Sequence, residues 1–340
     1  MPQISVIMPV YNTKAHHLHQ AIDSILSQSY TDFEFIILND SPYNKQIKEI
    51  ISSYNDPRII YQETTGDTGI AKSYNQLLDM ATSKYIALMN HDDISHKNRL
   101  KKQYEYLEKN KDIGLLGTAY KKFGEINRFK TIKNPTENAT IQSLLLFHSP
   151  IHHPTIMFRR QIAIEHKIRY NENFISLNDR QLCYDFSKYS KLANIKDVLY
   201  RYRFHEGMTS KQKKETIRKE RAIFHKIWFA YNAIELTPEE TDIFDNYITN
   251  GRSRIKDIQI LHQTKNILEK LATINQQKQI INVEEFNKIC GKYLIKRCLN
   301  SAWFGKIPTQ KILNQTTLPI RIKPILRILN FINSIKGVSR

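Results

Sequence analysis

The 340 residues carry a formal net charge of +18, and 41% of them are hydrophobic and 25% charged, as in a soluble globular protein of one or two domains. Three cysteines without a CxxC pair argue against a disulfide framework and a structural zinc site, and no apolar run reaches the roughly 18 residues of a membrane span. The N-terminus shows no signal-peptide pattern, so we expect a cytoplasmic protein.

The first 125 residues alternate strand and helix patterns, which predicts an α/β fold with a mostly parallel sheet and crossover helices. Apolar residues at helical spacing predict one helix around Leu18, Ile22 and Ile25 and another over residues 69–81. No GxGxxG follows the first strand, so the dinucleotide-binding fingerprint is missing. The predicted strands are residues 4–10, 33–38, 58–62, 85–89 and 113–120.

Mixed elements follow up to residue 210, and the rest of the chain is predicted to be almost entirely helical. We therefore divide the chain into a domain at 1–210 and a basic, mainly helical region at 211–340. The predicted elements are helices at 139–147 and 180–189, strands at 155–158 and 193–202, and helices at 211–231, 238–248, 253–272, 283–302 and 309–314.

Two adjacent aspartates, Asp92 and Asp93, stand where the apolar strand at 85–89 ends. Burying carboxylates there costs free energy unless a cation or hydrogen bonds compensate. Because open α/β sheets bind ligands at this end of their strands, a divalent cation with a nucleotide pyrophosphate is one interpretation. The other is a helix N-cap, since aspartates favour helix starts and a helix is predicted at 97–110.

Polar residues close the neighbouring predicted strands as well. Asn12 follows the first strand, Asp40 follows the second, and the segment 69–75 reads GIAKSYN. The carboxyl ends of parallel strands line one crevice, so these groups predict a single site that suits a nucleotide with a metal. This arrangement favours the metal interpretation of Asp92 and Asp93.

The order of these motifs resembles the family 2 glycosyltransferases with the GT-A fold. The resemblance covers about residues 3–210 and does not reach the helical region. It implies a nucleotide-diphospho-sugar transferase fold, with a mostly parallel central sheet flanked by helices, followed by a C-terminal helical extension. The motifs, in chain order, are PVYN at 9–12, the aspartate after the second strand, GIAKSYN at 69–75, YIALMNHDDIS at 85–95, HHPTIMFR at 152–159, Asn178-Asp179, and YRFHEG at 202–207.

The resemblance implies that Asp40 hydrogen-bonds the base of the nucleotide sugar, since a carboxylate accepts from a pyrimidine N–H. The alternative for Asp40 is an ordinary turn residue, and for Lys72, which could balance phosphate charge, a solvated helix lysine. The other residues that the resemblance places at the nucleotide are Pro9, Val10, Tyr11, Asn12 and Asp67.

The family's metal motif is usually Asp-x-Asp, and here Asn90 replaces the first acid. We expect Asn90 to retain a hydrogen bond to the ribose or the sugar. The resemblance makes Asp92 the first ligand and Asp93 the second ligand of Mn²⁺ or Mg²⁺, which prefer oxygen ligands together with phosphates. The metal would neutralise the diphosphate leaving group.

Inversion at an anomeric carbon needs a base for the acceptor hydroxyl. The resemblance assigns that role to Asp179, with an ordinary helix N-cap as the alternative. Asn178, Arg180 and Gln181 depart from the family pattern around it, which puts the acceptor specificity in doubt more than the base. His153 and His205 match family positions near the diphosphate or the acceptor, and a structural role is equally compatible with each.

The last third of the chain is strongly basic. Residues 211–340 hold 24 Lys and Arg against 11 Asp and Glu, which predicts an anionic partner, either nucleic acid or an acidic membrane surface. Residues 320–336 predict an amphipathic helix that lies on anionic lipid and brings the site to a lipid-linked acceptor; packing as core is the alternative. The apolar residues of that helix are Ile322, Ile325, Ile328, Leu329, Ile332 and Ile335.

We therefore expect an inverting, metal-dependent glycosyltransferase acting at the cytoplasmic face of the inner membrane. It would move a hexosyl or N-acetylhexosaminyl group from a nucleotide-diphosphate donor, UDP by preference, to a hydroxyl of a glycan or lipid-linked glycan in capsule or lipooligosaccharide synthesis. The alternatives are a basic nucleic-acid-binding protein and a nucleotidyltransferase on a similar fold. In the main interpretation no nucleic-acid partner is expected.

Overall fold

The structure is a computed structural model, and it describes residues 1–124, 130–204, 214–250, 253–305, 309–320, 324–325, 327–329 and 332. The chain forms two compact units. The sheet unit comprises Met1–Ile141 and Ser149–Glu220, and the helical unit comprises Gln142–His148 and Arg221–Arg340. The division falls inside helix α9 (Lys214–Tyr231), whereas the predicted boundary at 210 lies outside the described residues.

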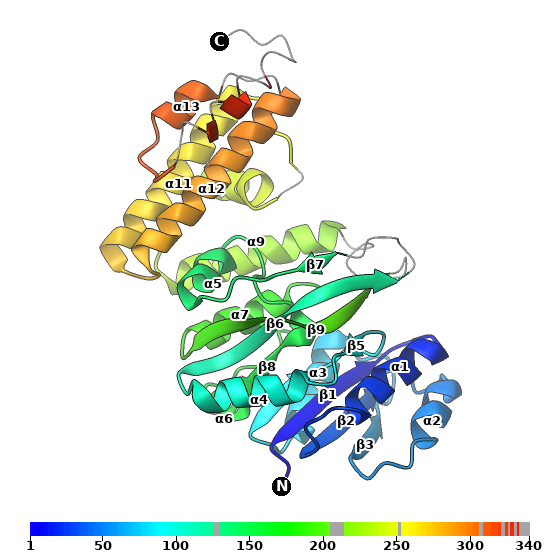
Figure 1. The fold of residues 1–340 in the computed structure, drawn as a ribbon. Helices are drawn as coiled ribbons and strands as arrows, with labels where there is room; N and C mark the ends of the chain where they lie inside the picture. The colour runs from blue at the N-terminus through cyan, green and yellow to red at the C-terminus, as the bar shows by residue number, and fades with distance from the viewer. Residues whose placement is uncertain are drawn as a thin grey trace. The chain divides into compact units, whose positions relative to one another are not determined.

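The sheet unit is built on one mixed sheet (Figure 1), in the order β3-β2-β1-β4-β8-β6-β9-β5 with β7 beside β6. Strands β1 to β4 run parallel to one another, as predicted, while β8, β5 and β7 each pair antiparallel with their neighbours. The strands are β1 (Ile4–Val10), β2 (Phe33–Asn39), β3 (Ile59–Glu63), β4 (Tyr85–Leu88), β5 (Ile94–Ser95), β6 (Ile113–Gly124), β7 (Thr131–Ile132), β8 (Met157–Arg159) and β9 (Lys191–Phe204).

Helices pack on both faces of this sheet, and for that reason the central strands are mostly apolar. Every residue of β1 is buried. Helices α1 (Ala15–Leu26), α2 (Lys45–Ser52) and α4 (Arg99–Lys109) share one hydrophobic cluster with β1 and β2. Helix α3 (Ile70–Met80) packs on β1 and β2, and α6 (Arg160–Glu165) and α7 (Asn178–Ser187) also belong to this unit, while α5 (Asn138–Leu145) is divided between the two units.

Two local differences from the prediction bear on the site. Helix α4 begins at Arg99 after the cap residue Asn98, and the short strand β5 precedes it, so the N-cap interpretation of Asp92 and Asp93 is wrong. The predicted strand at 155–158 begins at Met157, because His153–Thr155 form a 3₁₀ turn that contains Pro154.

The helical unit contains the predicted helices, several of them with side-chain caps. Thr237 forms a capping box, and Asp257 and Asn282 cap the two long helices that follow. These long helices, α11 (Ile258–Lys278) and α12 (Val283–Asn300), pack against each other as an antiparallel pair (Figure 1). The other elements are α10 (Pro238–Ile243), the π-helical turns η2 (Phe244–Ile248) and η3 (Ser301–Gly305), and α13 (Gln310–Asn314). Within the described residues, no helix combines the length and the apolar character that crossing a membrane requires.

The chain after α13 packs on this unit at a close approach. A Cβ atom on Gly291 of α12 would stand 2.8 Å from Cγ2 of Ile320, so a glycine is needed there. Further along, Ile325, Leu329 and Ile332 are buried, whereas Ile328 is half exposed. Ile322 and Ile335 lie outside the described residues. Three apolar side chains of the predicted amphipathic face are therefore buried within the protein.

Candidate active site

The residue after β2, Asp40, holds the loop that leads into α3. Its side chain is 3% exposed, and Oδ1 accepts hydrogen bonds from the Thr68 backbone N at 2.9 Å and Thr68 Oγ1 at 2.8 Å. Oδ2 accepts from the Gly69 backbone N at 3.1 Å. Oδ1 also lies 3.1 Å from Thr64 Oγ1, whereas Oδ2 has one donor and, with two lone pairs, room for one more. Asp40 is thus an anchored loop residue with an acceptor still to offer.

The end of β1 contributes the rim of this pocket. The Tyr11 ring is 43% exposed, and its hydroxyl is hydrogen-bonded to Tyr43 and Asp67, which raises the pKa of Tyr11 to about 12. Asn12 adopts a positive φ of 39°, and its backbone N donates to Ser41 Oγ at 3.1 Å. The structure therefore brings the ends of β1 and β2 and the loop before α3 together, as the sequence predicts.

The other predicted nucleotide residues surround the same place. Pro9 and Val10 are buried, and the Val10 carbonyl accepts from the Asp40 backbone N at 2.8 Å. Lys72 is exposed in the first turns of α3, one turn after the loop that Asp40 anchors. Its ammonium is thus available to a charged ligand.

Asp93 is a fully buried carboxylate clamped by three donors. Asn90 Nδ2 donates to Oδ2 at 2.9 Å, the Tyr200 hydroxyl donates to Oδ2 at 3.0 Å, and the Arg203 backbone N donates to Oδ1 at 2.7 Å. The Arg203 side chain also donates from Nε to the Asp92 carbonyl at 2.6 Å. The turn that carries both aspartates is therefore held by strand β9.

Burial sets the electrostatics of this turn. Desolvation, followed by repulsion from the Asp92 carboxylate, raises the pKa of Asp93 well above its ordinary value, and its three donors oppose that shift. Asn90, which the resemblance assigned to the ribose or sugar, here supplies one of those donors. A second aspartate at position 90 could not donate in its charged form.

Asp92 is the accessible member of the pair. Its side chain is partly exposed, while Asp93 is 0% exposed. Among the described residues no group of three His, Cys, Asp or Glu side chains is arranged to hold a metal. Mg²⁺ is commonly bound by one or two carboxylates together with substrate phosphates and water, so a single accessible carboxylate fits such an ion when the rest of its shell comes from the substrate.

Asp179 lies in the first turn of α7, and its side chain is partly exposed. Oδ1 accepts from the Arg180 backbone N at 2.6 Å, and the Ser149 hydroxyl lies between this carboxyl and the Ile151 carbonyl. Burial raises the pKa of Asp179, and these hydrogen bonds and the Arg180 charge reduce the shift. The residue at the N-cap is Leu177, so Asp179 is not itself the cap.

The aspartates of β4 and α7 face one common side chain. The phenol of Tyr202 on β9 lies within electrostatic reach of Asp92, Asp93 and Asp179, and these charges add to burial in raising its pKa. Tyr202 packs edge-on to His152, with 4.6 Å between ring centroids. The predicted base and the predicted metal residues are therefore all within electrostatic reach of the Tyr202 phenol.

Further aromatic side chains lie between this site and α3. His153 Nε2 lies 2.9 Å from the Tyr170 hydroxyl, and burial lowers the pKa of His153 to about 4, which leaves it neutral. The Tyr74 ring stacks on Tyr170 at 4.7 Å and meets His153 edge-on at 5.0 Å. His205, the other predicted histidine, lies outside the described residues.

The sequence did not predict the aromatic side chains of this site or the donors that hold the Asp93 carboxylate. Tyr74 reads as one apolar position of an amphipathic helix, and Tyr200 as one residue of a strand. The YRFHEG motif pointed to the right place, yet only its histidine was given a role, while Tyr202 and Arg203 make the observed contacts. A cavity of about 280 Å³ lies elsewhere, beside α6 and the start of β4, and contains none of the predicted site residues.

Comparisons with known proteins identify relatives of this chain. The sequence profile of glycosyl transferase family 2 matches residues 5–167. An uncharacterized glycosyltransferase of Methanocaldococcus jannaschii is 34% identical over 238 residues, which are 64% of this chain and 76% of that protein. The O-antigen biosynthesis glycosyltransferase WbnJ of Escherichia coli is 31% identical over 226 residues, 62% of this chain and 83% of that protein. The crystal structure of S. aureus TarS 1–349 in complex with UDP-GlcNAc is similar at a TM-score of 0.56 and 15% identity, covering 86% of this chain and 91% of that one.

Proposed function

Because the chain belongs to glycosyl transferase family 2 and is a glycosyltransferase with the GT-A fold, we propose that it transfers a sugar from UDP to a hydroxyl of a cell-surface glycan, with inversion. WbnJ is named for O-antigen biosynthesis, and TarS is crystallised with UDP-GlcNAc and with UDP, which supports this donor and this acceptor class. The transferred group is a hexosyl or N-acetylhexosaminyl unit. Glycosyl transfer takes the place of the nucleic-acid-binding and nucleotidyltransferase alternatives.

The donor is proposed to bind across the ends of β1 and β2. The open acceptor position on Asp40 Oδ2 takes the uracil N–H, and the exposed Tyr11 ring covers the base. Pro9, Val10 and Asn12 shape the ribose pocket beneath it. The accessible ammonium of Lys72 would balance the negative charge of the diphosphate, and Asp67 would lie at the rim of the pocket beside Tyr11.

The accessible carboxylate of Asp92 is proposed to hold Mn²⁺ or Mg²⁺ together with the diphosphate oxygens. The ion would supply positive charge to the leaving group. Asp93 is buried and already accepts three hydrogen bonds, so its observed contribution is to fix the turn on which Asp92 stands. A direct bond from Asp93 to the ion remains a prediction.

The chemistry is proposed to pass through Asp179. Its carboxylate takes the proton of the acceptor hydroxyl while that oxygen attacks the anomeric carbon from the side opposite the leaving group. The bond from that carbon to the diphosphate oxygen breaks, UDP leaves, and the configuration inverts. The observation that carries this assignment is the partly exposed Asp179 carboxyl, which has a raised pKa and lies, like Asp92 and Asp93, within electrostatic reach of Tyr202.

UDP release from a panel of UDP-sugars, with and without a soluble glycan acceptor and with Mn²⁺, Mg²⁺ or a chelator, tests the proposal. Replacing the base, Asp179→Asn, should lower kcat for transfer by about 10²–10⁴-fold and leave UDP binding intact. Asp92→Ala should remove the dependence of UDP binding on the metal. Asp185→Asn serves as the matched control in the same helix, because Asp185 pairs with Lys188.

Four results would contradict parts of this proposal. Full transfer activity in Asp179→Asn would place the base elsewhere. Metal-stimulated turnover that survives Asp92→Ala would place the metal elsewhere, and retention of configuration in the product would exclude a single displacement. Turnover of none of the nucleotide sugars would remove the donor assignment.

A further inference from the structure

The helical unit contains a buried cation with no hydrogen-bond partner among the residues that the structure describes. Arg297 on α12 is 1% exposed, and none of its nitrogens Nε, Nη1 and Nη2 has a hydrogen-bond partner in the part of the chain that the structure describes. Burial lowers the pKa of this guanidinium, and the neighbouring group that opposes the shift is the Tyr293 phenol, not a carboxylate. An arginine side chain nevertheless stays protonated in proteins, so the charge needs an anion.

The chain offers little negative charge near this position. No Asp or Glu follows Glu285 in the sequence. The carboxylate of Glu269 on α11 already accepts from Lys265, Thr316 and Thr317. At the start of α12, Glu284 pairs with Lys288. Both of these acids are therefore engaged with other groups.

Two buried hydroxyls without partners lie at the same level of the helix pair. Thr264 Oγ1 and Ser301 Oγ are fully buried and have no hydrogen-bond partner among the described residues. Ser301 follows Arg297 by one helical turn, so the two share a face of α12 and its η3 continuation. Thr264 stands 14 residues before the end of α11 at Lys278, and Arg297 stands 14 residues after the start of α12 at Val283. Because the two helices pack as an antiparallel pair, these positions lie at the same height along it.

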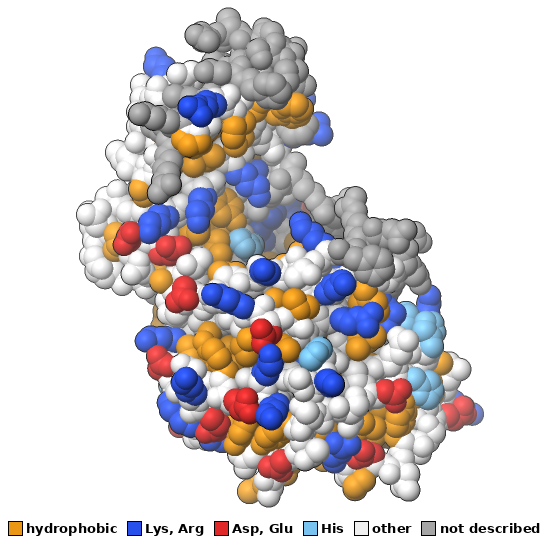
Figure 2. Space-filling view, in the orientation of Figure 1, with side chains coloured by type: hydrophobic (Ala, Val, Ile, Leu, Met, Phe, Trp, Pro, Cys, Tyr) orange, Lys and Arg blue, Asp and Glu red, His pale blue; other side chains and the backbone are white. Residues whose placement is uncertain are grey.

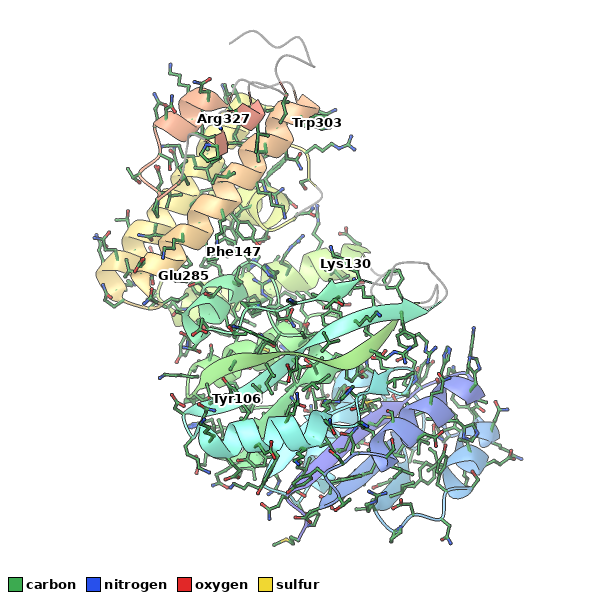
Figure 3. The ribbon with its side chains drawn as sticks, viewed as in Figure 1. Tyr106, Lys130, Phe147, Glu285, Trp303 and Arg327 are labelled. Carbon is green, nitrogen blue, oxygen red and sulfur yellow. The ribbon has the colours of Figure 1, made fainter. Side chains whose placement is uncertain are left out.

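The same two helices also bury apolar side chains. Leu261 and Leu268 of α11 and Leu294 of α12 are fully buried. Arg297 lies on the chain between Glu285 and Trp303, which Figure 3 labels at the two ends of α12 and its continuation. A buried guanidinium whose three nitrogens all lack partners is costly, and it indicates a ligand that supplies several acceptor atoms.

We propose that Arg297, Thr264 and Ser301 form a binding site for a phosphate group between α11 and α12. The guanidinium fork matches the spacing of phosphate oxygens, and the two hydroxyls donate to the remaining oxygens. This site lies in the helical unit and is separate from the donor site of the sheet unit. The group is supplied either by free phosphate or by a phosphate monoester such as a lipid headgroup, since both present the same oxygens.

Thermal unfolding and calorimetric titration of the full chain with inorganic phosphate test the first source. Phosphate should raise the melting temperature and saturate, while sodium chloride at the same ionic strength should not. Arg297→Met should weaken phosphate binding by about tenfold or more, because charge-assisted hydrogen bonds are lost. Lys296→Met removes an exposed charge from the next position of the same helix and should behave as the wild type.

The lipid source is tested with phosphatidylcholine vesicles that contain or lack phosphatidic acid. Binding that requires phosphatidic acid and Arg297, without a response to inorganic phosphate, identifies a headgroup; the reverse identifies the free ion. Ser301→Ala, which keeps the guanidinium, should weaken binding less than Arg297→Met and guards against a folding defect in the latter. Equal responses of wild type, Arg297→Met and Lys296→Met to both ligands, or no response at all, would overturn the proposal.

Discussion

Asn90 shows how one atom can decide the character of a site. Its Nδ2 donates to the buried Asp93 carboxylate, next to the donors from Tyr200 and Arg203. With aspartate at position 90, the same place would hold a second negative charge and lose a donor. The departure from the usual family motif therefore compensates the burial of Asp93.

We predict that Asn90→Asp lowers the free energy of unfolding by about 2 kcal/mol at neutral pH, because a hydrogen bond to a buried charge is replaced by repulsion. A carboxyl whose pKa is raised by folding destabilises the protein when it ionises. The deficit should therefore shrink as the pH is lowered from neutral into the mildly acidic range. Denaturant unfolding at two pH values measures it.

The control for this substitution is Asn98→Asp. Asn98 precedes α4 and makes no capping hydrogen bond with its side chain, so an aspartate there should be neutral or slightly stabilising. Equal stability of Asn90→Asp and Asn98→Asp at neutral pH would show that Asn90 is not needed by Asp93.

The pH dependence of transfer also belongs to single residues. A base must be ionised, and burial raises the pKa of Asp179, so kcat should fall with decreasing pH at a higher pH than an ordinary aspartate would give. The hydroxyl of Ser149 opposes this shift, and Ser149→Ala should therefore move the acid limb further up. Initial rates across the acidic range measure both effects. An acid limb that Ser149→Ala leaves in place would assign it to another group, such as the buried Asp93.

At the scale of elements, the loop between β3 and α3 depends on one glycine. Gly69 has φ 85° and ψ 156°, a conformation essentially restricted to glycine, and its backbone N donates to Asp40. Gly66, three residues earlier, has open space where a Cβ atom would stand and no positive φ. The two glycines thus differ in backbone conformation, not in crowding.

We predict that Gly69→Ala lowers the free energy of unfolding by about 1–3 kcal/mol and raises KM for the donor, because the strained backbone pulls away from Asp40. Gly66→Ala should leave both quantities near the wild-type values. Denaturant unfolding and donor kinetics of the two variants give the comparison. A wild-type KM for the donor in Gly69→Ala would show that this loop does not contribute to donor binding.

The basic charge of the whole molecule gives no single patch on the face that Figure 2 shows, where described Lys and Arg side chains are scattered singly and in small groups. The apolar end of the chain is more informative. Leu329 is 1% exposed, whereas its neighbour Ile328 is 48% exposed. Substitutions at these two positions can therefore distinguish a segment that packs within the protein from one that inserts into lipid.

We predict that Leu329→Asp destabilises the protein by about 3 kcal/mol or more, because a charge replaces a buried side chain, and that Ile328→Asp changes stability little. Thermal unfolding checks this, and binding to anionic vesicles is measured on the same variants. If Leu329→Asp weakened vesicle binding and left the melting temperature unchanged, this face would be a membrane surface and not part of the core.

Much of the architecture follows from local patterns. The strands of residues 4–10, 33–39 and 85–88 are mostly apolar because helices cover both faces, and this signal is strong within a single segment. The two-residue strand Ile94–Ser95 carries no such signal, since it is defined by its pairing with β9. Pairing with a distant strand cannot be read from so short a segment.

The site divides in the same way. The polar strand ends at Asp40 and Asp92 were found because they interrupt apolar runs. The unequal environments of Asp92 and Asp93 were not, because the backbone donor to Asp93 comes from Arg203, 110 residues later in the chain. The sequence predicted one shared role for Asp92 and Asp93, whereas tertiary contacts place them in two different environments.

Strand β9 has a mechanical consequence. It begins shortly after α7, which carries Asp179, and ends at the residues that grip Asp93, so one stretch of backbone joins the proposed base to the proposed leaving-group residues. Its long parallel pairing with β6 resists stretching, and irregularities in register occur at Thr118 to Tyr120. The length of this strand therefore sets the distance between Asp179 and the turn that carries Asp92 and Asp93. A residue inserted between Ser187 and Arg203 would alter the spacing between attack and departure without touching either group, which makes this stretch the place to vary reach while conserving chemistry.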